Sequence, residues 1–384
     1  MNHATREDTD HRDTSAAGLP PSGGSQAGRG RSAWPGRPES VRYTPASGGE
    51  PVQRQMAVLM RSDSGPPQSS DPPAVSVVVC TRNRGCQVAG TIRSVLASVG
   101  TDIELVVVDQ STDDETADAV TEWSDDARVR YVRSDTVGVS RGRNLGLRLA
   151  SHPIVLITDD DVEVQPDWAR NFRTAMDQAE RIAVGFCRVV AGPYDDTRGF
   201  VPNHAVDEPL VVRSLLSKSR ARGMGAGMAV RLAPVLAMGG FDEQLGPGAR
   251  MRSGEDRDLA ARCLVAGWWV CQTPTAEVVH TGFRTWGEGR SLARRDWYGI
   301  GAAYAKHVKC GRWAILPVLA HEVVWQGLVQ PVGRWLLGER KAGPRRMWYF
   351  VGGLIAGLRT PLERPHLLYR PATSNTVEPC RLAS

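Results

Sequence analysis

Short apolar runs alternate with segments of helical periodicity between residues 75 and 190. The runs are rich in valine and isoleucine, as expected of strands that are covered on both faces. Between them, apolar residues recur every three or four positions, which is typical of amphipathic helices. The predicted strands are residues 75–80, 103–108, 129–132, 154–158 and 182–190, and the predicted helices are residues 88–96, 113–123 and 140–150. This alternation predicts an α/β fold with a mostly parallel sheet flanked by helices.

Polar side chains follow three of the predicted strands. Thr81 comes directly after the first strand, Asp109 after the second, and the consecutive Asp159, Asp160 and Asp161 after the strand at 154–158. Ligands of parallel α/β sheets bind beyond the carboxyl ends of the strands. We therefore expect these side chains to converge on one edge of the sheet.

The aspartate triplet at 159–161 poses an electrostatic problem. Three like charges beside a buried strand repel one another unless a cation or strong hydrogen-bond donors lie among them. Carboxylate oxygens without a cysteine cluster favour Mg²⁺ or Mn²⁺, ions that often hold phosphate groups against protein carboxylates. The triplet therefore predicts a divalent-metal site, with a solvated acidic turn as the alternative.

Composition divides the chain into four parts. Residues 1–72 are rich in Gly, Ser, Pro, Asp and Arg and have no sustained apolar period, so we predict a disordered tail. Residues 73–290 hold the predicted α/β domain. Residues 291–370 are predicted to form a helical extension, and residues 371–384 a second disordered tail.

Two common nucleotide-binding motifs do not occur in the sequence. Residues 80–85 after the first strand read CTRNRG instead of GxGxxG, so a dinucleotide cofactor is not expected. The P-loop pattern GxxxxGK[ST] does not occur either. The glycines of residues 223–228 (GMGAGM) allow either a close approach of the backbone to a bulky group or a tight strand crossing.

Net charge, cysteine content and the N-terminal sequence bear on the partners and the compartment of the protein. The net charge of +5 is mild, and no nucleic-acid partner is expected. The seven cysteines are scattered without a CxxC pair, which indicates reduced thiols in a cytoplasmic protein. No charged start followed by an apolar stretch occurs at the N-terminus, so no signal peptide is predicted.

The C-terminal part of the chain is basic and aromatic. Eight of the eleven tryptophans lie from Trp268 onward, and residues 313–337 are mostly apolar. His321 and Glu322 lie near the middle of that stretch, so we do not predict a membrane-spanning helix. Tryptophan together with Arg and Lys favours helices that lie in the interface of the cytoplasmic membrane. The alternative is a helical cap whose apolar face packs on the core.

Six motifs carry a resemblance to a known family. They are VVVCTRNR (77–84), VVVDQSTDD (106–114), GVSRGRNLG (138–146), ITDDDV (157–162), GFDE (240–243) and GEDRDL (254–259). In this order and spacing they resemble glycosyltransferase family 2 over residues 73–283. The resemblance implies the GT-A fold, a Rossmann-like fold of nucleotide-diphospho-sugar transferases. It also implies inverting sugar transfer from a nucleoside diphosphate sugar with a divalent metal, Mn²⁺ or Mg²⁺.

The resemblance assigns donor-binding roles to five residues. Thr81 and Arg84 match the family's base-contacting loop. Asp109 matches a carboxylate that accepts hydrogen bonds from a nucleobase or ribose, with an Asx-turn cap as the alternative. Arg143 and Asn144 match the family's RN pair, where a guanidinium offsets the repulsion among the three aspartates. An exposed helix face with ordinary ion pairs is the alternative for this pair.

The resemblance also names the metal ligands. Asp161 matches the family's metal-binding carboxylate. Asp159 and Asp160 are expected to bind the donor, with Asp159 also joining the metal site. His280 lies where the family carries a metal-binding histidine, and a structural hydrogen-bonding role is its alternative. An imidazole ligand favours Mn²⁺ over Mg²⁺.

Glu255 and Asp256 match an acidic pair of the family. Inversion needs a base that takes the proton of the acceptor hydroxyl as it attacks the anomeric carbon opposite the diphosphate. In the family this base is the aspartate of the pair. The resemblance therefore assigns Asp256 as the base and Glu255 as a group that orients the acceptor or Asp256. Carboxylates that only stabilise a helix N-terminus are the alternative.

One function is expected, and two alternatives stay open. The expected function is transfer to a glycan or lipid-linked acceptor in cell-surface polysaccharide or glycolipid synthesis, in the cytoplasm or peripherally on the inner face of the plasma membrane. A sugar-nucleotide pyrophosphorylase would require a glycine-rich loop with a basic residue after the first strand, which residues 80–85 lack. A non-catalytic glycan-binding scaffold would be expected to have lost a carboxylate at the metal or base position, and none is missing.

Overall fold

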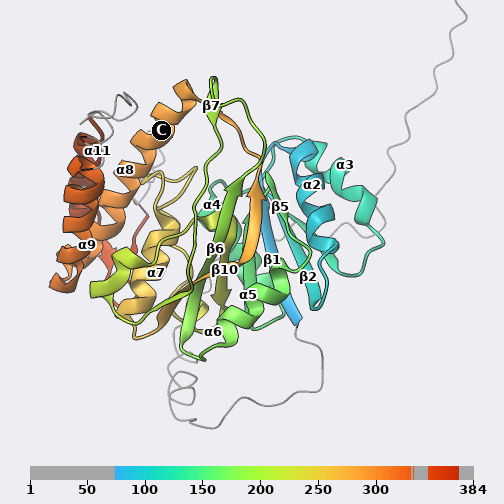
Figure 1. Cartoon of the computed structure of the whole chain (residues 1–384), viewed down its shortest axis with the longest axis horizontal. Coiled ribbons are helices and arrows are strands. Elements are labelled where there is room, and N and C mark those ends of the chain that lie inside the picture. Colours follow the sequence, from blue (N-terminus) through green and yellow to red (C-terminus); the bar gives the residue numbers. More distant parts are fainter. Residues whose placement is uncertain (1–73, 330–331, 333–344, 372–384) are drawn as a thin grey trace, which may run out of the picture. The chain divides into compact units, whose positions relative to one another are not determined.

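The computed structural model describes residues 74–329, 332 and 345–371. Within these ranges the main element is a nine-stranded sheet in the order β3-β2-β1-β4-β9-β6-β10-β5, with β8 paired to β10 (Figure 1). The strands β1, β2, β3, β4, β6 and β10 run in one direction, and β5, β8 and β9 run antiparallel to their neighbours. The predicted mostly parallel sheet is confirmed.

The predicted strands and helices are present, with ends shifted by a few residues. The strands are β1 (Ala74–Thr81), β2 (Asp102–Asp109), β3 (Val129–Arg133), β4 (Ile154–Asp159), β5 (Val162–Val164), β6 (Ile182–Ala191), β7 (Gly199–Phe200), β8 (Leu210–Val212), β9 (Met228–Arg231), β10 (Trp269–His280), β11 (Arg284–Thr285), β12 (Leu362–Glu363) and β13 (Leu368–Tyr369). The α-helices are α2 (Gly85–Leu96), α3 (Glu115–Val120), α4 (Val139–Leu149), α5 (Trp168–Asp177), α6 (Leu232–Ala237), α7 (Glu255–Val265), α8 (Trp286–Lys309), α9 (Leu316–Ala320) and α11 (Arg345–Arg359). Short 3₁₀ turns are η1 (Thr121–Trp123), η2 (Leu215–Arg220), η3 (Gly225–Gly227) and η4 (Trp313–Ile315), and η5 (His321–Val329) is a π-helix.

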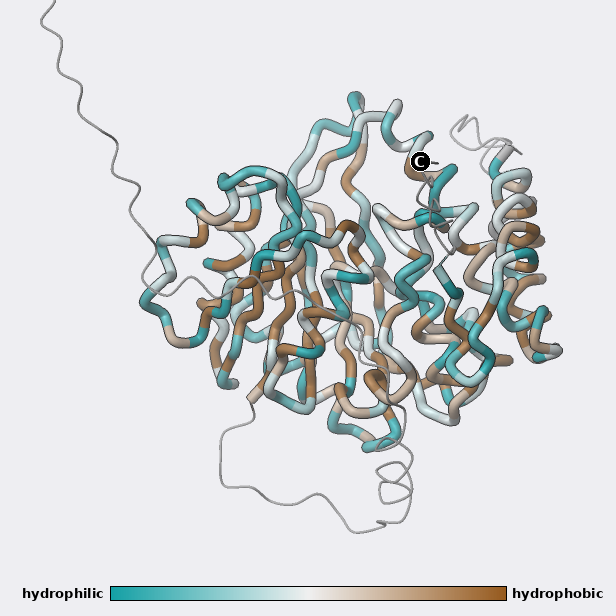
Figure 2. Tube along the Cα trace, turned by 180° about the vertical axis from the view of Figure 1, so that it is seen from behind, coloured by the Kyte–Doolittle hydropathy of each residue, from teal (hydrophilic) through white to brown (hydrophobic). Residues whose placement is uncertain are grey.

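Alternate side chains of the central strands enter two separate hydrophobic clusters. Val78 of β1 packs in one cluster with Leu147 of α4 and Leu259 of α7. Val77 packs in the other with Ile92 of α2. This alternation follows from the two-residue period of a strand, and full burial of a valine contributes roughly 1.5–3 kcal/mol. The sheet is therefore covered on both faces, and Figure 2 shows its strands as largely hydrophobic.

The carboxyl ends of the parallel strands meet at one edge of the sheet. Thr81 is in register with Asp109 in β2, and Cys80 is in register with Asp159 in β4. His280 ends β10, which runs in the same direction. Because these strands end side by side, the backbone positions of the polar residues converge at this edge, as predicted.

The C-terminal helices pack against the same core. α8 contacts both α11 and α7, and Trp297, Ile300 and Phe350 belong to the cluster that contains Leu259. The inner faces of these helices therefore form the helical cap that the sequence left open as an alternative. The predicted domain boundary after residue 290 falls inside the continuous α8.

Two further sequence predictions concern residues that the structure describes only in part. No helix within the described ranges is both long enough and apolar enough to cross a bilayer. The tails predicted at residues 1–72 and 371–384, except Pro371, lie outside those ranges.

Candidate active site

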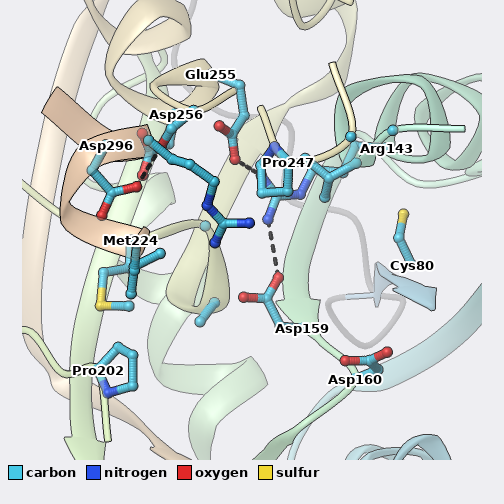
Figure 3. A pocket seen from close by; sticks show the side chains of 18 of the residues that line it. Cys80, Arg143, Asp159, Asp160, Pro202, Met224, Pro247, Glu255, Asp256 and Asp296 are labelled. Atoms are coloured by element: carbon cyan, nitrogen blue, oxygen red, sulfur yellow. Dashed lines mark hydrogen bonds and ion pairs between the residues drawn. The ribbon is translucent and has the colours of Figure 1, made fainter. Parts of the chain in front are cut away.

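A cavity of about 530 Å³ lies at the carboxyl edge of the sheet. Its walls come from the end of β1, the turn after β4, the start of α7 and the first half of α8 (Figure 3). The predicted site residues that line it are Thr81, Arg84, Arg143, Asp159, Asp160, Asp161, Glu255, Asp256 and His280. Of the predicted site residues, Asp109 and Asn144 do not line this cavity.

Asp160 is bound by the loop that follows β1. The hydroxyl of Thr81 donates a hydrogen bond to Asp160 at 2.7 Å, and Nη1 of Arg84 donates one at 2.8 Å. Burial raises the pKa of Asp160, while the charge of Arg84 opposes that rise. The Arg84 guanidinium therefore bonds to the acidic triplet, where it supplies part of the positive charge that three adjacent carboxylates require.

Asp161 faces three cationic or hydrogen-bonding side chains. His280 Nε2 lies 3.2 Å from its Oδ1, and nitrogens of Arg84 and Arg284 lie 3.2 and 3.4 Å from its Oδ2. Burial alone would raise the pKa of Asp161. The hydrogen bond and charge of His280, with the two arginines, outweigh burial and lower this pKa to about 2. Asp161 is therefore ionised at neutral pH, as a metal ligand must be.

Asp159, Asp161 and His280 form a group that fits a divalent metal. One ligand atom from each of the three lies within 4.8 Å of the others. The Nδ1 atom of His280 is buried and has no hydrogen-bond partner among the described residues. Two carboxylates and an imidazole suit Mn²⁺, and carboxylates also suit Mg²⁺. The structure thus brings together the three predicted metal ligands.

Arg143 connects the acidic triplet to the acidic pair. Its buried guanidinium donates to Asp159 through Nη2 and to Glu255 through Nη1, both at 3.0 Å (Figure 3). It also lies over the Phe241 ring, 5.6 Å from the ring centroid. A Cβ atom at Gly225 would overlap the guanidinium, so the glycine lets the backbone approach it closely. Gly225 thus fits the close-approach interpretation of the 223–228 glycines, whereas Gly227 packs tightly against Cys187 and Val189 of β6.

We expect Gly225→Ala to weaken the site without unfolding the protein. The added methyl group would displace the Arg143 guanidinium and misplace Asp159 and Glu255 together. A misplacement of about 1 Å costs about a hundredfold in rate. The measurements are the two activities that the resemblance implies, Mn²⁺-dependent nucleotide affinity and sugar transfer. Gly90→Ala is the matched control, because a Cβ atom at Gly90 has no neighbour within 4 Å. Equal values for both variants would contradict the role of Arg143.

Asp109 and Asn144 serve the fold in the described structure. Asp109 Oδ1 accepts the Ser111 N–H at 2.8 Å, and Oδ2 accepts the Tyr131 hydroxyl at 2.7 Å. This is the Asx-turn alternative, and direct contact of Asp109 with a nucleotide stays a prediction. Asn144 binds both the N–H and the carbonyl of Phe241. It therefore fixes the GFDE loop against α4.

Glu255 and Asp256 open α7 and lie in different environments. Glu255 is buried, and burial together with the charge of Asp256 raises its pKa to about 7 against the opposing effect of Arg143. Asp256 is half-buried, and its Oδ1 accepts the Arg257 N–H at 2.6 Å. Figure 3 shows this pair across the cavity from Asp159 and Asp160. The start of α7 therefore offers the cavity two carboxyl groups, one buried and one half-buried.

The sequence prediction missed three groups around the cavity. Arg284 contacts Asp161, and Asp296 of α8 lines the wall near Asp256. Arg257, beside Asp256, donates to the fully buried Glu322 of η5 at 2.7 Å. The sequence offered one sign of that pair, since Glu322 is the only carboxylate in the mostly apolar residues 313–337.

We expect Glu322→Ala to lower the free energy of unfolding by about 3 kcal/mol, because it leaves the Arg257 charge without its buried partner. Chemical denaturation measures this change. The control is Glu122→Ala, which removes an ion pair to Arg93 that is mostly exposed, and it should change stability by less than about 1 kcal/mol. Similar losses for both variants would contradict this reading of the buried pair.

Two family models match the chain. The model described as Glycosyl transferase family 2 matches residues 76–225. The model described as Glycosyl transferase family group 2 matches residues 154–359, which is more than half of the chain. Together they cover the sheet, the cavity and the helices α8 and α11.

Curated relatives align over shorter segments. Validoxylamine A glucosyltransferase of Streptomyces hygroscopicus subsp. jinggangensis is 32% identical over 114 residues, which cover 29% of this chain and 27% of that protein. Succinoglycan biosynthesis protein ExoO of Rhizobium meliloti is 28% identical over 218 residues, covering 56% of this chain and 62% of that protein. The matched segment thus spans less than two thirds of the length of either relative.

A solved structure agrees on the fold. The crystal structure of S. aureus TarS residues 1–349 superposes with a TM-score of 0.51 at 15% identity, covering 74% of this chain and 82% of that one. The mixed, mostly parallel sheet and its flanking helices are those of the GT-A fold expected from the sequence. With both family models matched along the cavity-forming residues, this chain belongs to glycosyl transferase family 2.

Proposed function

We propose that this protein is an inverting, metal-assisted glycosyltransferase that moves a sugar from a nucleoside diphosphate sugar to an acceptor hydroxyl, with Asp256 as the base. One observation carries the proposal: a single cavity is lined by the Asp159–Asp161–His280 group and by the Glu255–Asp256 pair. Transfer needs positive charge for the diphosphate and a base for the acceptor. A cation held by the first group would provide the charge, and the second group offers the base.

The donor would bind at the triplet side of the cavity. Asp159, Asp161 and His280 would hold a divalent cation, which, when bound, neutralises charge on the diphosphate leaving group. Arg84 and Arg284 lie against Asp161 and are available to the phosphate oxygens. Arginine suits this role because its planar fork binds phosphate through two hydrogen bonds.

The acceptor would bind at the α7 side. Its hydroxyl oxygen forms a bond to the anomeric carbon as the bond from that carbon to the diphosphate breaks, and the hydroxyl proton passes to the Asp256 carboxylate. The diphosphate leaves with the electron pair of the broken bond. Glu255 orients Asp256 or the acceptor, and Arg143 fixes Glu255 relative to Asp159.

We propose a glycan or lipid-linked acceptor in cell-surface polysaccharide or glycolipid synthesis, with catalysis on the cytoplasmic side. The named role of the succinoglycan biosynthesis relative supports a polysaccharide product. The six cysteines in the described part of the chain are unpaired, which supports a reducing compartment. We also propose the cytoplasmic membrane surface as a partner.

A thermal-shift screen of nucleoside diphosphates with and without Mn²⁺ tests this proposal. A ligand at a hundred times its Kd stabilises the folded state by about 2.7 kcal/mol, so a bound nucleotide should raise Tm by several degrees. We expect one nucleotide to raise Tm more with Mn²⁺ than without it, and its sugar derivatives to be hydrolysed slowly. Binding without any effect of Mn²⁺, together with no hydrolysis of any sugar donor, would reject the proposal.

A further inference from the structure

Helix α11 is apolar on two faces. Its inner face approaches α8 so closely that a Cβ atom at Gly353 would overlap the Tyr298 carbonyl oxygen. Its outer face carries four exposed apolar side chains with helical spacing, so they form one row. They are Trp348, Val351, Ile355 and Leu358, and Trp348 is 78% exposed. Packing on the core explains the inner face only.

The segment before α11 exposes a second apolar group. From residue 313 to residue 325, every exposed residue is apolar. Trp313 is 62% exposed and Trp325 is 50% exposed, and Leu316 and Val324 accompany them. Proteins seldom leave large aromatic side chains in water in such numbers without a binding role.

The two apolar groups belong to neighbouring helices. η5 contacts both α9 and α11, and Figure 1 draws α9 and α11 together beside α8. Of the fifteen large hydrophobic side chains that are exposed in the described ranges, ten lie between residues 313 and 358. The exposed apolar surface is thus concentrated in one part of the chain. We call these two groups the apolar surface.

Positive charge borders the apolar surface. Exposed Arg312 precedes Trp313, and exposed Arg359 follows Leu358. On α8, Arg294 lies over the Tyr349 ring at 5.9 Å. Within the described residues of 312–329 and 346–359, Glu322 is the only carboxylate, and it is buried in its pair with Arg257. Within these two ranges the accessible charge is therefore cationic.

We propose that the apolar surface docks on a membrane that contains anionic phospholipids. Exposed tryptophans match the headgroup depth of a bilayer, aliphatic side chains match the acyl boundary, and arginines match anionic headgroups. α8 connects this surface to the cavity, because Leu292 and Asp296 line the cavity while the same helix packs against α11. Docking would hold the cavity near the bilayer, where a lipid-linked acceptor would be found.

Vesicle co-sedimentation of the full-length protein tests this inference. At low salt we expect binding to vesicles of phosphatidylcholine with phosphatidylglycerol and little binding to phosphatidylcholine alone. The double variant Trp348→Glu/Ile355→Glu should reduce binding by about tenfold or more, since it places charge on the inserting row. The matched control is Val99→Glu/Leu236→Glu, which changes two exposed apolar residues elsewhere and should bind like the unaltered protein.

Three results would overturn the inference. They are no binding of the unaltered protein to either vesicle, equal binding by both double variants, and a dimer in sedimentation that only the Trp348→Glu/Ile355→Glu variant loses. The last result would assign the surface to a second copy of the chain. Vesicle binding is independent of the transferase proposal. The substituted residues do not line the cavity, so donor hydrolysis without vesicles should stay unchanged in both variants.

Discussion

Asp256→Asn is expected to lower the rate of sugar transfer by about 10²–10⁴-fold while nucleotide binding with Mn²⁺ is retained. The amide keeps the shape of the side chain but does not take up the proton of the acceptor hydroxyl, and general bases contribute about this factor. Asp256 reaches the cavity from the start of α7, away from the triplet, so its loss leaves the donor side intact. Steady-state transfer and nucleotide calorimetry together measure the two effects.

Asp296→Asn is the comparison that makes this result informative. Asp296 lines the same wall, its carboxylate accepts a hydrogen bond from Ser253 at 2.9 Å, and burial raises its pKa. We expect its amide variant to retain most transfer activity. Near-normal transfer by Asp256→Asn with loss of transfer in Asp296→Asn would move the base to α8 and contradict the assignment.

Asp161→Ala is expected to remove the effect of Mn²⁺ on nucleotide affinity and to lower donor turnover by about a thousandfold. Metal neutralisation of a leaving group is worth several kcal/mol, and about 4 kcal/mol corresponds to a thousandfold in rate. Asp161 is the carboxylate that faces His280, Arg84 and Arg284. Titrations of the nucleotide with and without Mn²⁺ measure the effect.

Two controls separate metal loss from unfolding. Asp167→Ala removes a half-exposed aspartate at the start of α5 and should leave both titrations unchanged. The Tm of Asp161→Ala without ligand reports whether the unpaired arginines disturb the fold. Unchanged nucleotide affinity in the presence of Mn²⁺, in a folded variant, would refute the metal assignment of Asp161.

The sequence predicted the parallel half of the sheet because its strands are short apolar runs separated by amphipathic helices. It did not predict that β9 lies between β4 and β6 and runs antiparallel to both. The run from Met228 to Arg231 is too short to have a diagnostic period, and its partners are distant in sequence. Pairing of that kind depends on tertiary packing, which hydrophobic periodicity does not encode.

The sequence also predicted part of the candidate site, namely which motif residues line it. The order of the motifs predicts that Asp161, His280 and Asp256 share one site. The structure places all three in one cavity. The partners of charged side chains were harder to foresee. Arg84 bonds to Asp160, while the contact with a nucleobase that the resemblance implies stays a prediction, and Glu322 is paired with a residue 65 positions away. Such pairs are set by the close packing of distant segments, so no local pattern marks them.

Carboxylates that are distant in the sequence meet in one cavity, and we propose that they hold a cation that carries a diphosphate. Crystals grown with Mn²⁺ and a nucleoside diphosphate test it most directly, through anomalous scattering from manganese. We predict a manganese peak at bonding distance from Asp161 and His280, with diphosphate oxygens beside it and Asp256 facing the empty part of the cavity. A nucleotide bound with manganese remote from Asp161 would contradict the account.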